Sequence, residues 1–267
     1  MLGISTAITR AGMVPAAGVA SDALTAAIMA LDPVDLWPLT ETSGSVAAAT
    51  VSAARNGSYS GVLLDQLDGP IAGTRVGTWW SPLNSVCDLY STSLISAFNG
   101  AVGTFLIFAY IPTSGWQDGA LSNIVDFRAN ETEDSVRIIK SATTGLVTIR
   151  YEAGNVASLV THDTSSYAGW ALVGCTWDVN AGEDGEMKAY WLESSAGGQV
   201  GATQTGLGTW SGPLLEDWMT LGAKGAATPS QIIFGYLGFA SIYDKVLSEG
   251  EIQGIMAPAD PPPPDPE

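Results

Sequence analysis

Positive charge is scarce in this sequence. Of its 267 residues only 10 are lysine or arginine, against 27 aspartates and glutamates, which gives a formal net charge of -17. Proteins that bind nucleic acid neutralise its phosphates with basic side chains, so this balance argues against a nucleic-acid partner. Charged residues of both signs make up 14% of the chain, below the roughly 25% of an average soluble protein. We therefore expect small residues, or neighbouring subunits, to cover much of the surface.

The residues of metal centres and nucleophilic catalysis are also scarce. Cys87 and Cys175 are the only cysteines, and they show neither metal-ligand spacing nor a disulfide framework, so buried free thiols are expected. His162 is the only histidine, and it lies in a polar stretch without a nucleophile motif, which predicts a surface position. We assign no catalytic residue, and we predict that the protein is not an enzyme and needs no cofactor.

Long apolar runs are missing as well. Residues 1–33 are rich in Ala, Gly, Val, Thr and Ile, yet Pro15, Gly18 and Asp22 interrupt any run that could span a bilayer. No membrane insertion is therefore predicted.

The N-terminal segment does contain a short helical pattern. Leu24, Ile28 and Leu31 recur at helical spacing after Asp22, a plausible N-cap, and Pro33 ends the pattern. A single short helix cannot bury such a face alone. We expect residues 1–33 to form an arm that packs on another chain through these three side chains. Packing of the arm on its own domain is the alternative.

What the chain does contain is many short strand-like segments separated by glycines and polar clusters. Alternating or continuous apolar patterns mark residues 36–44, 75–80, 85–90, 103–111, 122–128, 135–140, 146–151, 170–178, 186–192 and 232–243. The continuous run at 103–111 predicts a strand buried on both faces. We expect the closing strand, 232–243, to join the distant segment 36–44 in one sheet. This pattern predicts an all-β fold, a two-sheet antiparallel sandwich.

The composition divides the chain into three parts. We expect residues 1–33 to be the arm, residues 34–255 to form one sandwich domain, and residues 256–267 to be an extended proline-rich tail.

Several short motifs occur in a characteristic order. They are Leu36-Trp37-Pro38-Leu39, Asn56-Gly57, Trp170 to Asp178, Lys188-Ala189-Tyr190, Leu221-Gly222-Ala223, and Ile242-Tyr243 with Leu247-Ser248. This order resembles the laminin-G-like group of concanavalin A-like lectin and glucanase domains, over about residues 34–255. Phe98 to Thr104, followed by Gly115 to Gly119, resembles the version found in tailed-bacteriophage structural proteins. The resemblance implies a jelly-roll sandwich of two curved sheets and a place in a virion.

The resemblance also implies where a ligand would bind, at loops on one rim of the sandwich. Exposed tryptophans there could stack on a sugar ring, and the candidates are Trp79, Trp80, Trp116 and Trp210. For the pair Trp79 and Trp80, burial in the core is the favoured interpretation.

Calcium is the other ligand that the resemblance suggests. Asp178, Asn180, Glu183 and Asp184 form an oxygen-rich segment with the chemistry that a hard cation requires. Their spacing fits no defined calcium loop, so a solvated hairpin turn is favoured over a calcium site.

A glycan hydrolase needs two carboxylates facing one another across the bond it cleaves, and the resemblance to glucanase domains implies that they lie at alternate positions on one strand. Glu131 and Glu133 have that spacing, but they lie in a polar run typical of a turn, which argues against hydrolysis. The favoured function is a structural protein of a phage particle, in a capsid decoration, fibre or tail. Its arm would contact other virion proteins, and a homo-oligomer, most simply a trimer, is expected. The alternative is a carbohydrate-binding module for host surface glycans.

Overall fold

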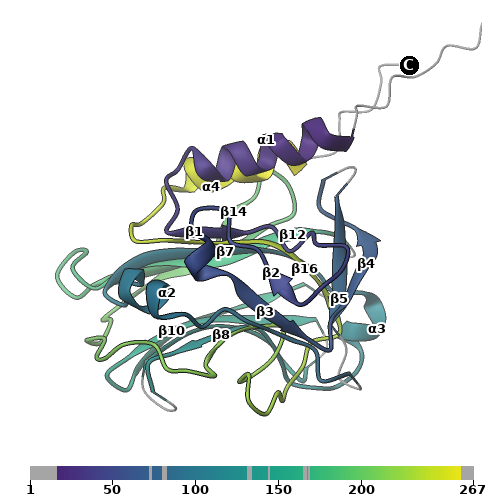
Figure 1. The fold of residues 1–267 in the computed structure, drawn as a ribbon. Coiled ribbons are helices and arrows are strands. Elements are labelled where there is room, and N and C mark those ends of the chain that lie inside the picture. The colour runs from purple at the N-terminus through teal and green to yellow at the C-terminus, as the bar shows by residue number, and fades with distance from the viewer. Residues whose placement is uncertain are drawn as a thin grey trace, which may run out of the picture.

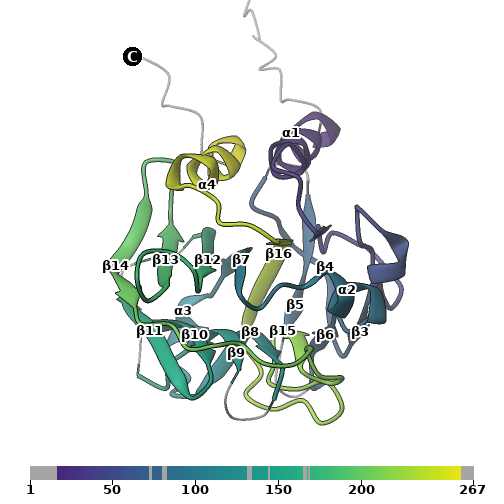
Figure 2. The same cartoon turned by 90° about the vertical axis from the view of Figure 1, so that its left-hand side faces the viewer.

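The protein is a sandwich of two antiparallel β-sheets with two helices on one outer face (Figures 1 and 2). The computed structural model describes residues 17–71, 74–79, 83–130, 134–143, 145–164, 167 and 169–259, with the backbone alone for residues 17–22. The predicted all-β sandwich is confirmed.

Sheet A is the sheet that the helices cover. Its strands, in spatial order, are β14 (Gly198–Thr205), β13 (Glu186–Leu192), β12 (Ala171–Asp178), β7 (Val102–Tyr110), β16 (Gly235–Tyr243), β5 (Arg75–Trp79) and β4 (Leu63–Asp68), and β1 (Asp35–Trp37) also pairs with β16.

Sheet B forms the other layer. Its strands, in spatial order, are β11 (Val156–Asp163), β10 (Leu146–Ala153), β9 (Ser135–Lys140), β8 (Ser122–Arg128), β15 (Met219–Leu221), β6 (Val86–Asp88), β3 (Gly57–Ser60) and β2 (Val46–Ala47). The helical elements are α1 (Ala17–Met29), η1 (Ala53–Arg55), α2 (Thr92–Ala97), α3 (Thr113–Trp116), α4 (Glu249–Met256) and η3 (Ala257–Ala259). Within the described residues, none of the helices has the length and apolar content needed to cross a membrane.

The closing strand β16 joins the two ends of the sandwich. It pairs with β7 along most of its length and with β1, where Trp37 lies opposite Ala240 (Figure 1). The expectation that the segments around Trp37 and Phe239 share one sheet is confirmed. Phe239 itself has a positive φ of 48°, at an irregularity in the pairing of β16 with β7.

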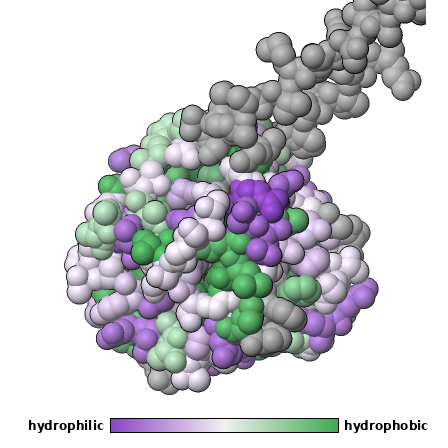
Figure 3. Space-filling view, turned by 45° about the vertical axis from the view of Figure 1, so that its right-hand side comes forward, coloured by the Kyte–Doolittle hydropathy of each residue, from purple (hydrophilic) through white to green (hydrophobic). Residues whose placement is uncertain are grey.

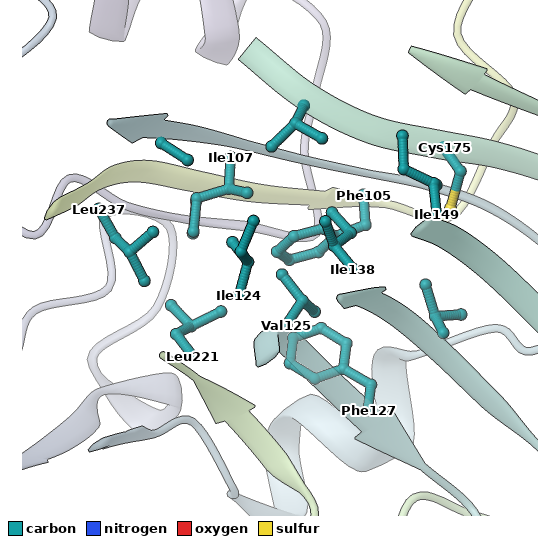
Figure 4. Packing of buried hydrophobic residues seen from close by; sticks show 14 of the residues in the cluster. Phe105, Ile107, Ile124, Val125, Phe127, Ile138, Ile149, Cys175, Leu221 and Leu237 are labelled. Carbon is teal, nitrogen blue, oxygen red and sulfur yellow. The ribbon is translucent and has the colours of Figure 1, made fainter. Parts of the chain in front are cut away.

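The main core lies between the two sheets. Figure 4 shows Phe105 and Ile107 of β7 meeting Val125 and Phe127 of β8. The rings of Phe105 and Phe127 meet edge to face, with centroids 5.0 Å apart. All four side chains are fully buried, so the hydrophobic effect on these residues stabilises the contact between the sheets.

A second core lies on the outer face of sheet A. There Leu106 and Phe108 of β7 and Phe239 of β16 pack beneath α1 and α4, through residues such as Leu24 and Ile252. Strand β7 is therefore apolar on both faces because both faces are covered, as the continuous run predicted.

The helix of the N-terminal segment packs on its own sandwich. Leu24 and Ile28 are fully buried in the second core, and Leu31 is half-buried against the same cluster. The expectation that these three side chains anchor the arm to another chain is therefore wrong, and the alternative of a self-packed arm is correct. The reason is that the outer face of β7 and β16 needs a cover, which α1 and α4 supply together. Residues 1–16 and 260–267, in the expected arm and tail, lie outside the described residues.

The scarce cysteines and the histidine lie on strands. Cys87 and Cys175 are buried free thiols, as predicted, and burial raises the pKa of Cys175 to about 12. His162 lies half-buried on β11, with its ring centroid 6.0 Å from that of Trp191. The two thiols are therefore protonated and unreactive at neutral pH.

Candidate functional site

Two of the four tryptophans predicted for the rim are buried. Trp79 is fully buried and lies edge-on to Tyr59, with ring centroids 6.4 Å apart. Trp116 is 5% exposed and lies at a similar distance from Trp191. The prediction of sugar-stacking rim residues is therefore wrong for Trp79 and Trp116, because both fill the core between the sheets.

Trp210 is half-buried, but its ring is used within the chain. Its centroid lies 5.4 Å from that of Phe98 and 5.9 Å from that of Tyr151. A Cβ on Gly100 would lie 2.2 Å from the Trp210 ring, so only glycine allows this close approach. The ring therefore closes one end of the core. Trp80 lies outside the described residues.

The acidic segment predicted for calcium forms a turn held by its own backbone. The Asp178 carboxylate accepts a hydrogen bond from the Asn180 N–H at 2.8 Å. The Gly185 N–H donates to the Ala181 carbonyl, and the Leu207 N–H donates to the Asp184 carbonyl, both at 2.8 Å.

In the part of the chain that the structure describes, no group of three or more His, Cys, Asp or Glu residues could hold a metal ion. The arrangement of this turn, in which Glu183 is exposed, corresponds to the favoured solvated hairpin, and calcium binding stays a prediction. Glu131 and Glu133, the pair considered for hydrolysis, lie outside the described residues.

The sheet register reveals a different candidate. On the outer face of sheet A, beyond the helices, Tyr110 lies opposite Tyr236, and Tyr236 lies opposite Thr78. Thr78 in turn lies opposite Leu63. Paired residues of neighbouring strands project from the same face of a sheet, so these side chains form one row. Trp170, next to the start of β12, extends the row beside Tyr110.

We call this surface the aromatic groove; it comprises Leu63, Thr78, Tyr110, Trp170, Phe234 and Tyr236. Leu63, Thr78, Phe234 and Tyr236 line a hollow of about 440 Å³. Figure 3 brings the β4 and β5 side of the molecule forward and shows a hydrophobic strip there beside a strongly hydrophilic patch.

The rings of the aromatic groove lie at regular spacing but are not coplanar. The centroids of Tyr110 and Tyr236 are 5.7 Å apart, with 63° between the ring planes. The centroids of Tyr110 and Trp170 are 5.9 Å apart, with 51° between the planes. All three side chains are half-buried. The groove therefore presents a twisted series of ring surfaces.

The hairpin of β4 and β5 gives the groove a charged rim. Arg75 donates hydrogen bonds to the carboxylates of Asp65 at 2.7 Å and Asp68 at 2.8 Å, and both hydrogen bonds raise the pKa of Arg75. The Trp170 indole N–H donates to the backbone carbonyl of Asp68 at 3.2 Å. This bond ties the Trp170 ring, at the β12 end of the row, to the hairpin.

The chemistry of the groove combines ring faces with hydrogen-bonding groups. In the described part of the chain, no hydrogen bond involves the hydroxyl of Tyr110 or Tyr236. The side chain of Asp68 is 81% exposed at the rim. Ligands with apolar faces and hydroxylated edges suit such a surface, since both kinds of contact are available at once.

Comparisons with known proteins identify the fold. No protein-family model matches the chain, and no curated protein matches it. The solved structure of the binding domain of botulinum neurotoxin serotype D is similar to it, with a TM-score of 0.56 and 14% sequence identity over 85% of this chain and 51% of the toxin chain.

Two related toxin structures match in the same way. The receptor-binding domain of the mosaic serotype C/D toxin gives a TM-score of 0.57 at 12% identity, over 83% of this chain and 49% of that chain. The serotype C1 binding domain gives 0.56 at 12% identity, over 90% of this chain and 53% of that chain. This chain spans about half the length of these toxin domains. The likeness establishes a shared β-sandwich fold, and the expected bacteriophage setting stays a prediction.

Proposed function

We propose that this protein is a non-enzymatic carbohydrate-binding module that binds a glycan chain in the aromatic groove. The observation that carries the proposal is the row of half-buried rings, Trp170, Tyr110 and Tyr236, left open beside the helices. The likeness to toxin domains described as receptor-binding domains supports a binding role for the sandwich.

The spacing of the rings suits consecutive sugar units. The three rings are 5.7 and 5.9 Å apart because they come from neighbouring strands, whose separation is about 4.8 Å. This spacing is close to the length of one pyranose unit, so each ring can contact one sugar of a chain. The tilt between the rings suits a single twisted chain better than the flat surface of a crystalline polysaccharide.

The rim suits a neutral glycan. The exposed carboxylate of Asp68 and the hydroxyls of Tyr110 and Tyr236 can hydrogen-bond to sugar hydroxyls. Two carboxylates, of Asp65 and Asp68, face one guanidinium, of Arg75, so this part of the rim carries excess negative charge, which disfavours acidic sugars.

The setting of this activity is a further part of the proposal. The sequence resembles structural proteins of tailed bacteriophages, so the module would be displayed on a phage particle and bind host surface glycans. Leu24 and Ile28 are buried in the sandwich itself. Contacts with other virion proteins, and assembly of a trimer, would therefore depend on residues 1–16 or on other surfaces. Mass spectrometry of purified virions of the source phage tests this setting.

Glycan binding is tested with an oligosaccharide array followed by titration calorimetry. The variants Tyr110→Ala and Tyr236→Ala should each weaken binding by about tenfold or more, since stacking on one aromatic ring contributes about 1 kcal/mol or more. Leu159→Ala is the matched control, because Leu159 is 43% exposed on β11 of the other sheet. Its affinity should equal that of the wild type. Absence of binding to any neutral oligosaccharide, or equal binding by the tyrosine variants, would refute the proposal.

A further inference from the structure

A second hollow lies on the side of the sandwich opposite α1 and α4. Its volume is about 330 Å³, and its lining includes Asp217, Trp218, Lys224, Thr228 and Ser230. These residues belong to the loops that flank β15, and such loops lie at the bottom of Figure 2, with both helices at the top. We call this hollow the Trp218 pocket.

One wall of the pocket is fixed to sheet B. The Arg128 N–H donates to the Trp218 carbonyl at 3.0 Å, and the Trp218 N–H donates to the Leu215 carbonyl at 3.2 Å. Trp218 directly precedes β15, which is paired on both sides. The half-buried indole is therefore held by a strand rather than by a loose loop.

The other wall is a tight hairpin. Lys224 and Ser230 exchange two backbone hydrogen bonds, at 2.8 and 3.1 Å. The Ala226 N–H donates to the Asp217 carbonyl at 2.7 Å, which ties the hairpin to the first wall. The hollow between the walls is thus formed before any ligand arrives, which lowers the entropic cost of binding.

The lining of the pocket includes one cationic and one anionic side chain. Lys224 and Asp217 line the same hollow, yet within the described ranges Lys224 forms no ion pair. An ammonium group only donates hydrogen bonds and a carboxylate only accepts them. A ligand hydroxyl does both, so two adjacent hydroxyls could bridge this ammonium and this carboxylate.

The surrounding charges select against ionic ligands. Burial raises the pKa of Asp88, and the nearby carboxylates of Asp217 and Glu216 raise it further, so an added anion would meet like charge. The Arg128 guanidinium lies 4.5 Å from the centroid of the Trp218 ring, and the Lys224 ammonium lies 5.9 Å from it. A cationic ligand would therefore compete with two resident cations for the ring. The remaining class is a neutral polyhydroxylated ligand.

We infer that the Trp218 pocket is a second carbohydrate site, which takes a single neutral sugar residue through adjacent hydroxyls. This site is separate from the aromatic groove, and the inference does not depend on the function proposed for the groove. With both sites occupied, one sandwich could hold two glycans at once, and a ligand long enough to reach both sites would gain avidity.

The test uses saturation-transfer NMR and calorimetry with the full chain. The probes are methyl α-glucoside, methyl α-mannoside and N-acetylglucosamine, with glucuronate and choline as charged comparators. At least one neutral probe should bind with a millimolar Kd, and the charged comparators should bind at least about tenfold more weakly.

Variants distinguish the pocket from the groove. Asp217→Asn and Lys224→Gln nearly preserve side-chain size and leave the backbone bonds intact, so both should unfold at the wild-type temperature. Each should weaken binding of the neutral probe by about tenfold, whereas Tyr236→Ala should leave that binding unchanged.

Three results would overturn the inference. They are no saturation transfer to any neutral sugar, unchanged binding in both pocket variants, or loss of monosaccharide binding in Tyr236→Ala, which would assign the sugar to the groove. If oligosaccharides bind nowhere in the groove but the pocket variants still lose the monosaccharide, the groove proposal alone fails.

Discussion

The outer face of sheet A has two halves that differ in their cover. Along β7, Leu106 and Phe108 lie fully buried beneath α1 and α4, and Tyr110 at the end of the strand is half-buried beyond them. Along β16, Phe239 belongs to the covered half and Tyr236 to the open half. The same two strands therefore contribute to a closed core and to an open groove.

The side chains change with the cover. At the centre of the covered half Leu106, Phe108 and Phe239 have no polar side-chain atoms to leave unsatisfied, although Tyr243, the last residue of β16, is buried there too. The open positions carry tyrosine, and Trp170 stands beside them; these residues combine a large apolar ring with a group that hydrogen-bonds to water or ligand. The residues of the open half are therefore suited to partial exposure. A core surface that had lost its cover would instead expose wholly apolar side chains.

The largest expected effect on stability comes from a substitution in the covered half. Phe108 is fully buried, and its ring lies edge-on to Phe239, with centroids 6.3 Å apart. Phe108→Ala should lower the free energy of unfolding by about 4 kcal/mol, because it removes a ring and leaves a cavity. Tyr110→Ala, two residues along the same strand, should lower it by less than about 1 kcal/mol. Urea unfolding measures both, and equal losses would contradict the distinction between the halves.

The helical cover itself is the next target. Leu24 of α1 is fully buried in the second core, so Leu24→Ala should cost about 3 kcal/mol of unfolding free energy. Leu31→Ala is the control, since Leu31 is only half-buried, and it should cost less than about 1 kcal/mol. If Leu24→Ala left stability unchanged and altered only assembly, the helix would serve another chain after all.

The strands of the sandwich could be predicted from sequence because each carries its own signal. The apolar run at 103–111 and the alternating segments 122–128 and 135–140 correspond to β7, β8 and β9 within a residue. Strands β14 and β15 were not predicted. Strand β14 has no fully buried residue and contains four polar side chains, and β15 has only three residues, so neither shows a clear period.

The groove could not be predicted, because it depends on register. Tyr110, Trp170 and Tyr236 are far apart in sequence, and only the pairing of β7 with β12 and β16 brings them together. The prediction of sugar-stacking rim residues was wrong for Trp79 and Trp116. The sequence near a predicted turn does not indicate which face of the sheet an aromatic side chain occupies. The one local signal was Tyr110 itself, a polar-tipped residue at the end of a run buried elsewhere.

A smaller effect is expected at the start of α4. The Ser248 hydroxyl accepts a hydrogen bond from the Glu251 N–H at 3.3 Å, and the Glu251 carboxylate accepts one from the Ser248 N–H at 2.7 Å. Ser248→Ala should cost about 1 kcal/mol of unfolding free energy, because it removes half of this capping box. Ser248→Asp keeps an acceptor and should restore most of the loss. Equal unfolding midpoints for the alanine variant and the wild type would show that α4 does not depend on its cap.

The smallest effect on stability should appear in the open half, where it separates ring from hydroxyl. Tyr236→Phe keeps the ring, and Tyr236→Leu keeps a side chain of moderate size but removes the aromatic face. Both should change the free energy of unfolding by less than about 0.5 kcal/mol, since the side chain is only half-buried. If the ring binds sugar by stacking, calorimetry should show a severalfold loss of affinity for leucine and almost none for phenylalanine. The reverse order would assign recognition to the hydroxyl, and the groove would then act through hydrogen bonds rather than through its aromatic row.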